Sequence, residues 1–413
     1  MIIELTTTDV AHGGYCVARF DGRVVFVTGA LPGEQVDVEI TEKRSKMWYG
    51  RVVDVLTPSP DRIPHVWGLA ERTGIGGADL GHVSLEAGRR WKTRVIETQM
   101  SRIAHLSTHV VVEPAPGDEA RRGLAWRTRV TFQVDSSGRL GMYGAKSHTI
   151  HPVDGMPLAH EDIQAVLSFD IDHEFPNLAG GTRTYVRPSA SPLVVVDHLP
   201  RTRRSGPTTV VRAVDVDHPG RTHPALATVT EGVRTPQGEW TYDVAADGFW
   251  QVHREAPSIL VQAVLESVGS PDAPILDLYC GSGLFTQPLT DLGPVTAIEA
   301  SPQAVASCRK NTRGRNVTCL EGDVSAVLAE LPSSNTGVVV CDPPRSGAGA
   351  PTVAQISRLS PDKVVYVACD PAALARDIAI FAQHGYELET LRAFDLFPMT
   401  HHVECLATLT QPS

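Results

Sequence analysis

The sequence predicts an α/β protein that combines a Rossmann-like domain with a small OB-like β-barrel and a central mixed α+β domain. Three observations lead to this prediction. Short strand-like segments separated by turns fill residues 1–57, alternating apolar strands and helices fill 246–413, and the region between them, 58–245, mixes both kinds of element. A chain of 413 residues is long enough for about three domains of ordinary size.

The first region, residues 1–57, is expected to form a closed barrel. Turns at Gly13-Gly14 and Asp21-Gly22 separate short segments of β character. Apolar and polar residues alternate over 36–40, which indicates a sheet with one buried face. Such a run of short strands fits the OB type of barrel, a common platform for nucleic acids.

The central region begins after Pro58-Ser59-Pro60, whose prolines mark a boundary. A helix is expected from about residue 85 to 103, followed by several strands with turns at Ser137-Gly138 and Gly180-Gly181. No motif in this region carries chemistry, so a role in docking a substrate is the remaining expectation.

The C-terminal region, 246–413, begins with a helix through Ile259 and Ala263. Near-continuous apolar strands then alternate with helices, which predicts a parallel sheet covered on both faces. The expected strands are 275–278, 295–299, 338–342 and 363–367. The last two segments, 386–397 and 403–409, have no helix between them and predict a mixed sheet with an antiparallel edge.

The charge pattern is uneven. The net charge of −10 is unusual for a protein that binds nucleic acid, because phosphate contacts supply most of the sequence-independent affinity. The basic residues nevertheless cluster before residue 205, which suggests a basic docking side. The clusters are Lys43, Arg44, Lys46 and Arg51; Arg89, Arg90, Lys92 and Arg94; Arg121, Arg122, Arg127 and Arg129; and Arg201, Arg203 and Arg204.

Targeting and cysteine patterns narrow the class of protein. The N-terminus lacks the basic start and apolar run of a signal peptide, and no apolar run reaches the length of a membrane span. We therefore expect a cytoplasmic protein with no membrane partner. Seven cysteines without a C-x-x-C spacing argue against a disulfide framework and against a zinc site. No metal site is predicted.

A cofactor pocket is predicted at the end of the first C-terminal strand. Gly281 and Gly283 follow Asp277 and allow a ligand to approach the backbone closely. Glu299 ends the next strand, where an acid can accept hydrogen bonds from ribose hydroxyls, and Asp323 supplies a further strand-end carboxylate. Each acid alone could equally cap a helix. A third glycine for a pyrophosphate is missing, so the pattern favours S-adenosylmethionine over a dinucleotide.

Two further motifs lie where the switch point of such a sheet would place a substrate. Asp342 precedes two prolines and Arg345, and the prolines leave the Asp342 carboxylate free to bond a planar base. Cys369 lies between a strand and a helix. A cysteine at a helix N-terminus is expected to have a lowered pKa, because the free N–H groups and the dipole favour its thiolate.

A thiolate in a methyltransferase suggests a specific target atom. Carbon 5 of uracil is a poor nucleophile, and addition of a thiolate at carbon 6 activates it. A base must then remove the proton from carbon 5. We expect Glu404 to be this base, with His401 and His402 as alternatives.

Together these residues resemble the TRAM-domain family of RNA (uracil-5-)-methyltransferases, which have a class I methyltransferase domain. The resemblance covers most of the chain and includes 21–27, 31–34, 249–252, 277–283, 342–345, 369–371, 376–377 and 397–404. It implies an RNA partner whose target uridine is flipped out of its stack. The residues implied or expected to act are the nucleophile Cys369 and the base Glu404; the cofactor contacts Gln251, Tyr279, Gly281, Gly283, Glu299, Asp323 and Asp342; and the substrate contacts Asp342, Arg345, Arg127 and Arg129.

The chain departs from the family at two places. Many relatives carry an iron-sulfur cluster after the TRAM domain, whereas here the corresponding stretch reads Ile75-Gly76-Gly77-Ala78, with His65 at another cysteine position. No cysteine occurs between residues 17 and 279, so no iron-sulfur cluster is predicted. His253 replaces a commoner asparagine after Gln251-Val252.

Three alternatives remain open at this point. The chain could methylate an amino group, although Arg345 stands where such enzymes normally have an aromatic residue. It could also be an RNA-binding or folding factor with a vestigial methyltransferase domain. Within uracil methylation, 23S ribosomal RNA is preferred because the TRAM-bearing architecture resembles the ribosomal branch, and the T-loop uridine of transfer RNA is the alternative. The sequence does not indicate an oligomeric state.

Overall fold

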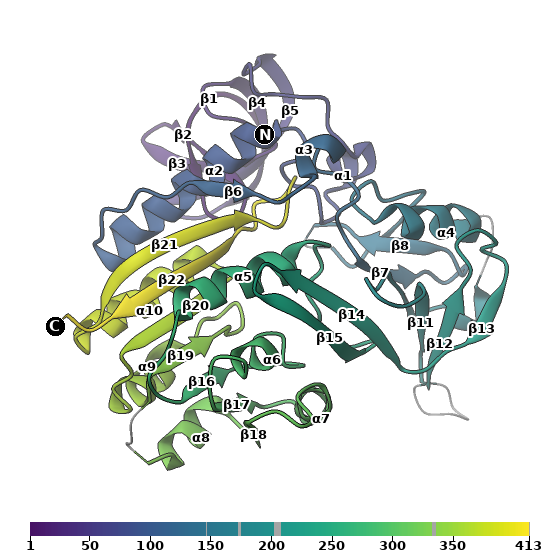
Figure 1. Ribbon diagram of the computed structural model, residues 1–413. Coiled ribbons are helices and arrows are strands. Elements are labelled where there is room, and N and C mark those ends of the chain that lie inside the picture. Colours follow the sequence, from purple (N-terminus) through teal and green to yellow (C-terminus); the bar gives the residue numbers. More distant parts are fainter. Residues whose placement is uncertain (146, 172–174, 202–207, 333–335, 413) are drawn as a thin grey trace.

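The computed structural model describes residues 1–145, 147–171, 175–201, 208–332 and 336–412 (Figure 1). Arg203 and Arg204, which the sequence placed in a basic cluster, lie outside the described residues. Within the described ranges, no helix is long and apolar enough to cross a bilayer.

The N-terminal region is a closed five-stranded barrel with the order β1-β2-β3-β5-β4, as predicted. The strands are β1 (Ile2–Ala11), β2 (Tyr15–Phe20), β3 (Arg23–Thr28), β4 (Gln35–Lys43) and β5 (Met47–Thr57). Alternate residues point inward, so that Val25, Val27, Val36 and Val38 are fully buried. Helix α2 (Leu85–Gln99) closes one side of the barrel through Trp91, which shares this core.

The central region is built on a seven-stranded antiparallel sheet with the order β13-β12-β11-β10-β7-β8-β9 among the described residues. Its strands are β7 (Arg129–Val134), β8 (Leu140–Tyr143), β9 (Ile150–Pro152), β10 (Thr182–Val186), β11 (Val194–Leu199), β12 (Thr208–Val214) and β13 (Thr222–Pro224). Helix α4 (Glu161–Ile171) packs on it through Ile163, Val166 and Leu167. The short helices are α1 (Gly68–Thr73), α3 (Asp118–Arg121) and the 3-10 turn η2 (Pro176–Leu178).

The C-terminal region contains the predicted mixed sheet, with the order β18-β17-β16-β19-β20-β22-β21-β6 in the described part of the chain. The strands are β16 (Ile275–Leu278), β17 (Val295–Glu299), β18 (Val317–Glu321), β19 (Val338–Cys341), β20 (Lys363–Ala368), β21 (Glu387–Asp395) and β22 (Glu404–Thr410). Strands β16 to β20 are parallel, and β22 runs antiparallel between β20 and β21. The helices are α5 (Ala256–Val268), α6 (Thr286–Leu289), α7 (Pro302–Asn311), α8 (Val324–Glu330), α9 (Gly349–Arg358) and α10 (Pro371–Gln383).

Segments of the central region cross into the C-terminal domain. Strand β6 (Val112–Pro114) pairs in parallel with β21, so that the antiparallel pair is not the edge of the sheet. Helix α2 continues as a short π-helix, η1 (Met100–Ala104), which packs against α10. The hairpin β14 (Thr228–Thr235) and β15 (Gly238–Ala245) shares the core of α5 (Figure 1). These contacts join segments that are far apart in the sequence, so that residues on both sides of position 246 share one hydrophobic core. No local pattern in the sequence indicates these contacts.

Candidate active site

The predicted site residues of the C-terminal region lie at the carboxyl ends of the parallel strands, whereas Gln251, Arg127 and Arg129 lie elsewhere. The strand order reverses between β16 and β19, and in open α/β sheets ligands commonly bind beside the loops at such a switch point. Asp342 follows β19, and its backbone N–H donates to the Leu278 carbonyl oxygen at the end of β16 over 3.3 Å. The glycine loop and the Asp342 loop are therefore neighbours.

The glycine loop after β16 leaves open space in front of its backbone. Tyr279, Gly281 and Gly283 all have positive φ values, at 61°, 55° and 92°. A Cβ built at Gly281 would meet nothing within 4 Å, whereas one at Gly283 would lie 3.1 Å from the Cys308 sulfur. Gly283 is thus required for packing, and Gly281 exposes the backbone to a ligand.

The carboxylates around this loop fit S-adenosylmethionine. Glu299 is oriented by its own hydrogen bonds, accepting from the Gly281 N–H at 3.1 Å and the Ser301 N–H at 2.7 Å. The buried Asp277 accepts from the Thr286 hydroxyl through one oxygen, and its other oxygen has no partner among the described residues. Burial raises the pKa of Asp277 to about 7. A glycine loop open to a ligand, with an oriented acid beside it, suits a ribose and an amino-acid moiety.

Asp323 is exposed and caps helix α8 by accepting from the Ala326 N–H at 3.0 Å. The cap and a cofactor contact are compatible, because a carboxylate has a second oxygen. Tyr279 is half-buried, and its hydroxyl lies 3.4 Å from the Thr352 hydroxyl of α9. Both residues stand at the same edge of the sheet as Glu299.

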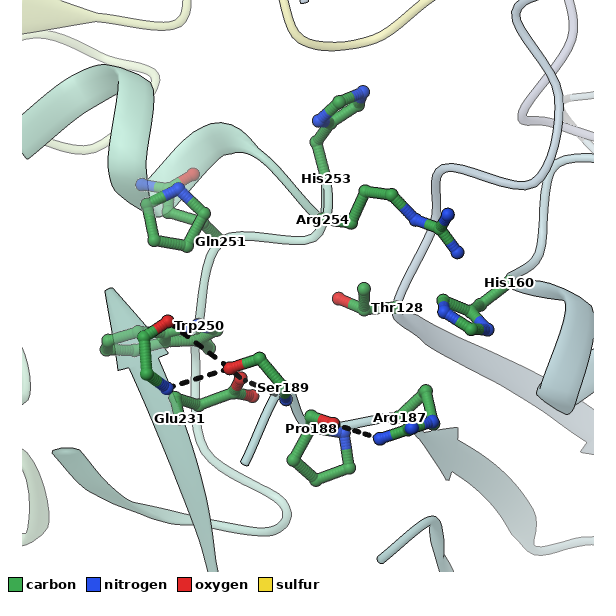
Figure 2. Close-up of a pocket in the computed structure, with 12 residues that line it drawn as sticks. Thr128, His160, Arg187, Pro188, Ser189, Glu231, Trp250, Gln251, His253 and Arg254 are labelled. Carbon is green, nitrogen blue, oxygen red and sulfur yellow. Dashed lines mark hydrogen bonds between the residues drawn. The ribbon is translucent and has the colours of Figure 1, made fainter. Parts of the chain in front are cut away.

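Gln251 lines a cavity of about 180 Å³ between the central sheet and the start of α5 (Figure 2). Figure 2 places Gln251 and Trp250 on one side of this cavity and His160 and Arg187 on the other. The charged groups there are paired, Arg187 with Asp162 and Arg254 with Glu161. The neighbouring His253 is buried, bonded to Asp118 at 3.0 Å and stacked on Trp126. The histidine therefore has a packing role at this junction.

The proposed nucleophile and base lie on adjacent strands. Ala368 of β20 pairs with Cys405 of β22, so Cys369 and Glu404 sit at the same end of this antiparallel pair. Glu404 is 4% exposed, and Cys369 is half-buried. Burial and the nearby Asp342 carboxylate hold the pKa of Glu404 well above its usual value, while Arg345 acts in the opposite direction. Burial also raises the pKa of Asp342 to about 7.

The expectation that the helix N-terminus lowers the pKa of Cys369 is wrong. Burial, followed by the Glu404 and Asp342 carboxylates, raises the pKa of this thiol to about 12. The free N–H groups of helix α10 are not available to the sulfur, because the Asp370 side chain accepts from Ala372 and Ala373. The free protein therefore holds Cys369 as a neutral thiol beside two acids with raised pKa values.

The two histidines occupy different positions from Glu404. The His401 ring bonds to Asp79 of the central region at 2.6 Å, and the His401 backbone N–H donates to the same carboxylate at 3.0 Å. The rings of His401 and His402 lie 4.0 Å apart. Burial, His401 and Arg345 lower the pKa of His402 to about 4. Strand pairing places Glu404, rather than either histidine, next to Cys369.

The three predicted arginine contacts differ in their surroundings. Arg345 is exposed. Arg127 is half-buried, and burial together with Arg345 lowers its pKa, so the two guanidinium groups are near each other. Arg129 is 8% exposed, and its guanidinium donates to the carbonyl oxygens of Ala246 and Gly248. These bonds connect β7 to the C-terminal domain and remove Arg129 from the residues that we propose to touch RNA.

The predicted basic docking side is partly neutralised in the described residues. Carboxylates from neighbouring strands or helix turns pair with many of the clustered cations, an arrangement that the linear sequence does not reveal. The pairs are Arg44–Glu42, Arg51–Glu39, Arg89–Glu119, Arg90–Asp61, Lys92–Asp395, Arg94–Asp9 and Arg121–Asp118. These pairs, of which Lys92–Asp395 is buried, leave less charge for phosphates than the count of basic residues suggested.

Two residues within the motifs that carry the resemblance were given no individual role by the sequence analysis. Phe249 is 77% exposed beside Gln251, and an exposed aromatic ring at a nucleic-acid site is suited to stack on a base. Asp377 is fully buried and accepts from the Ala348 and Gly349 N–H groups, which fixes the loop that follows Arg345. The motif Arg376-Asp377 drew attention to this aspartate in the sequence, but the motif did not show which groups the aspartate binds.

Comparisons with known proteins agree with this geometry. Family models match three parts of the chain: TRAM domain over residues 2–53, methyltransferase domain over 275–343, and tRNA (uracil-5-)-methyltransferase over 325–411. The chain is 40% identical over 436 residues to an uncharacterized RNA methyltransferase of Bifidobacterium longum, covering 100% of this chain and 97% of the relative. It is 38% identical to an uncharacterized RNA methyltransferase of Streptomyces avermitilis, with 98% and 97% covered.

Among solved structures, the chain is similar to the tRNA (uracil-54, C5)-methyltransferase of Pyrococcus abyssi in complex with S-adenosyl-L-homocysteine. The TM-score is 0.72 at 19% identity, and the match covers 99% of this chain and 100% of the other. This likeness shows that the three-part fold, including the barrel, is shared.

Proposed function

The chain belongs to the family of TRAM-domain RNA (uracil-5-)-methyltransferases, and from this premise we propose that it methylates carbon 5 of a uridine through a covalent adduct with Cys369. The observation that supports the mechanism is the pairing of β20 with β22, which brings Cys369 and Glu404 to the same end of two adjacent strands, with the Asp342 carboxylate near enough to raise the pKa of both. A half-buried thiol next to two acids with raised pKa values suits a reaction that adds a nucleophile and later removes a proton.

The cofactor contacts in this proposal are Gln251, Tyr279, Gly281, Gly283, Glu299, Asp323 and Asp342. When bound, S-adenosylmethionine supplies an electrophilic methyl group on a positively charged sulfonium. Gly281 exposes its backbone, and the Glu299 carboxylate is held by the Gly281 and Ser301 N–H groups, so that it can receive ribose hydroxyls without reorganising.

The protein groups divide the chemistry between them. The Cys369 thiol loses its proton and adds to carbon 6 of the uracil, which makes carbon 5 nucleophilic. After carbon 5 has gained the methyl group, the Glu404 carboxylate removes the carbon 5 proton, and the electrons of that bond expel the Cys369 sulfur. Because the Cys369 pKa is about 12 in the free protein, the thiol requires a nearby acceptor when the base is bound. Asp342 is such an acceptor once it is ionised, which leaves the Glu404 carboxylate free to take the carbon 5 proton later.

The RNA contacts are proposed to be Arg345, Arg127 and Phe249, together with Asp342 at the target base. Arg345 is exposed and close to Arg127, so the two cations can receive a phosphate. Phe249 can stack on a base that neighbours the target uridine. A flipped uridine is required, because the sulfur must reach carbon 6 from above the ring.

Ribosomal RNA is our first candidate substrate, on the resemblance of the TRAM-bearing sequence to the ribosomal branch. The T-loop uridine of transfer RNA is the second candidate. This candidate is favoured by the similarity to the Pyrococcus abyssi enzyme, whose name gives uracil 54 of transfer RNA as its target. The match covers 99% of this chain, the barrel included. A single experiment distinguishes the two candidate substrates.

The test is nucleoside mass spectrometry of ribosomal and transfer RNA, isolated separately from wild-type cells and from a deletion strain. Loss of 5-methyluridine from the ribosomal pool supports the first substrate, and loss from the transfer RNA pool supports the second. If both pools keep all of it, the proposal fails. Loss of an N-methylated nucleoside would instead favour an amino-group methyltransferase, and a binding-only factor would leave all methylated nucleosides unchanged.

A second test addresses the adduct. RNA that contains 5-fluorouridine should form a covalent complex with the wild-type protein in the presence of S-adenosylmethionine, because fluorine at carbon 5 blocks elimination. Cys369→Ala should form none. A covalent complex in Cys369→Ala, or turnover by that variant, would show that another residue is the nucleophile.

A further inference from the structure

The β1–β2 turn of the barrel, residues 12–14, contacts both loops of the proposed active site. The His12 Nε2 lies 3.1 Å from an Asp370 oxygen, directly after Cys369. A Cβ at Gly14 would lie 2.9 Å from the Asp79 carboxylate and 3.4 Å from the His401 Cβ, so the turn is in close contact with that pair as well. The backbone at Gly14 has a φ of 79°.

Asp370 connects this turn to the nucleophile. One of its oxygens accepts from the Ala372 and Ala373 N–H groups at 3.0 and 2.8 Å and caps helix α10, while the other oxygen faces His12. Burial alone would raise the pKa of Asp370, but the His12 hydrogen bond and the two backbone N–H groups outweigh it and lower the pKa to about 2. The carboxylate is therefore charged at neutral pH and held at both oxygens.

The contact at Gly14 concerns the loop that leads to Glu404. Asp79 accepts from both the backbone and the ring of His401, and the centres of the His401 and His402 rings lie 4.0 Å apart. Glu404 begins β22 only two residues after His402. One turn of the barrel thus borders the loops of the proposed nucleophile and of the proposed base, although it is more than 350 residues away in the sequence.

We propose that His12 is a positioning residue for methyl transfer, which holds the Cys369 loop in its reactive geometry through Asp370. The barrel then contributes to the rate of the chemical step in addition to any contribution to RNA affinity. This inference rests on the proposed function. The His12 and Asp370 side chains are 39% and 26% exposed, and a pair this accessible adds little to folding stability. A small displacement of a reacting group, in contrast, reduces the rate strongly.

The experiment compares His12→Ala, His12→Gln and a matched control, His218→Ala, in the full-length protein. His218 is also an exposed histidine paired with an aspartate, Asp215 at 3.2 Å, in the central region. The single-turnover rate of methyl transfer is measured with saturating protein and S-adenosylmethionine on RNA from a deletion strain. The dissociation constant for the same RNA is measured by filter binding.

We expect His12→Ala to reduce the single-turnover rate by roughly 10- to 100-fold, the range that a misplacement of about 1 Å produces, with the RNA dissociation constant unchanged. His12→Gln keeps a side-chain N–H that can reach Asp370, so it should recover most of the rate. His218→Ala should match wild type. In a double-mutant cycle with Asp370→Asn, the losses should not add, because both changes break one interaction.

Several results would overturn the inference. These are an unchanged rate in His12→Ala, a loss confined to RNA affinity, or additive losses with Asp370→Asn. If His12→Ala does not fold, His12→Gln and Asp370→Asn are compared instead. A large loss of rate in folded His12→Gln, together with a wild-type rate in Asp370→Asn, would also refute the inference. A wild-type protein without methyl transfer to any RNA would refute the proposed function instead, so the two failures are distinguishable.

Discussion

Replacing Glu404 by glutamine is expected to lower the pKa of the Cys369 thiol. The pKa of this thiol is about 12 rather than the ordinary 9, because of burial first and the Glu404 carboxylate second. At pH 8, a thiol with a pKa near 12 is ionised in roughly one molecule in ten thousand, and one with a pKa of 9 in roughly one in ten. Wild-type Cys369 should therefore react with an alkylating agent roughly 1000-fold more slowly than an ordinary thiol.

The size of the expected change in the Cys369 pKa follows from the charge that Glu404→Gln removes. A neighbouring charge typically shifts a pKa by roughly 1 to 3, and glutamine keeps the shape without the charge. Burial and Asp342 remain, so the pKa should fall but stay above 9. The alkylation rate at pH 8 should rise by roughly 10- to 100-fold, with the smaller values expected if Glu404 is partly protonated there.

The assay is iodoacetamide labelling of the folded protein between pH 7 and 11, with the peptide that contains Cys369 followed by mass spectrometry. The exposed Glu330→Gln serves as a matched control and should leave the rate unchanged. Rapid labelling of wild-type Cys369 at pH 7, with a midpoint at or below 9, would refute the argument from burial and restore the one from the helix N-terminus. No increase in Glu404→Gln at any pH up to 11 would show that this carboxylate does not act on the thiol.

Three other substitutions test the site and its support. Glu404→Gln should accumulate a covalent RNA complex on unmodified RNA with S-adenosylmethionine and lose turnover by at least ~100-fold, because the carbon 5 proton is not removed; denaturing gels measure this. Phe249→Ala should weaken RNA binding by roughly 5- to 150-fold, since stacking on a base is worth ~1–3 kcal/mol, without a change in S-adenosylmethionine affinity by calorimetry. Lys92→Met should lower the free energy of unfolding by ~3–5 kcal/mol, because it leaves the Asp395 carboxylate buried and unpaired; urea unfolding measures it.

Each of these substitutions has its own control. Adding Cys369→Ala to Glu404→Gln should abolish the complex, and a complex that persists would assign the adduct elsewhere. Phe249→Trp keeps a stacking ring and should bind RNA like wild type, so equal weakening by alanine and tryptophan would argue against stacking. Adding Asp395→Leu to Lys92→Met should restore much of the stability, and a further loss would show that the pair is not the origin of the effect.

Local sequence patterns determined the architecture and the identity of the proposed reactive groups. Alternation of apolar residues predicted the barrel, and apolar strands between helices predicted the parallel sheet, because side-chain periodicity follows from backbone geometry alone. Cys369 was singled out by its place between a strand and a helix, and Glu404 by the resemblance to the uracil methyltransferase family. Each stands at a strand end, and the ends of neighbouring strands meet at one edge of a sheet.

Tertiary contacts decided the properties of those groups. The direction of the Cys369 pKa depends on its burial and on Glu404 and Asp342, whereas the sequence showed only the helix that follows. Arg129 looked like a substrate contact until its bonds to Ala246 and Gly248 placed it inside the protein.

Tertiary contacts also decided which residues hold the site in place. Strand β6, with three residues, carries no periodicity of its own and finds its place only because β21 offers it an open edge. The pairs Lys92–Asp395 and His12–Asp370 join residues separated by hundreds of positions. Hydrogen bonds and ion pairs act over a few ångströms in space, and which distant residues reach that range is set by how the whole chain packs, so no local pattern in the sequence contains them.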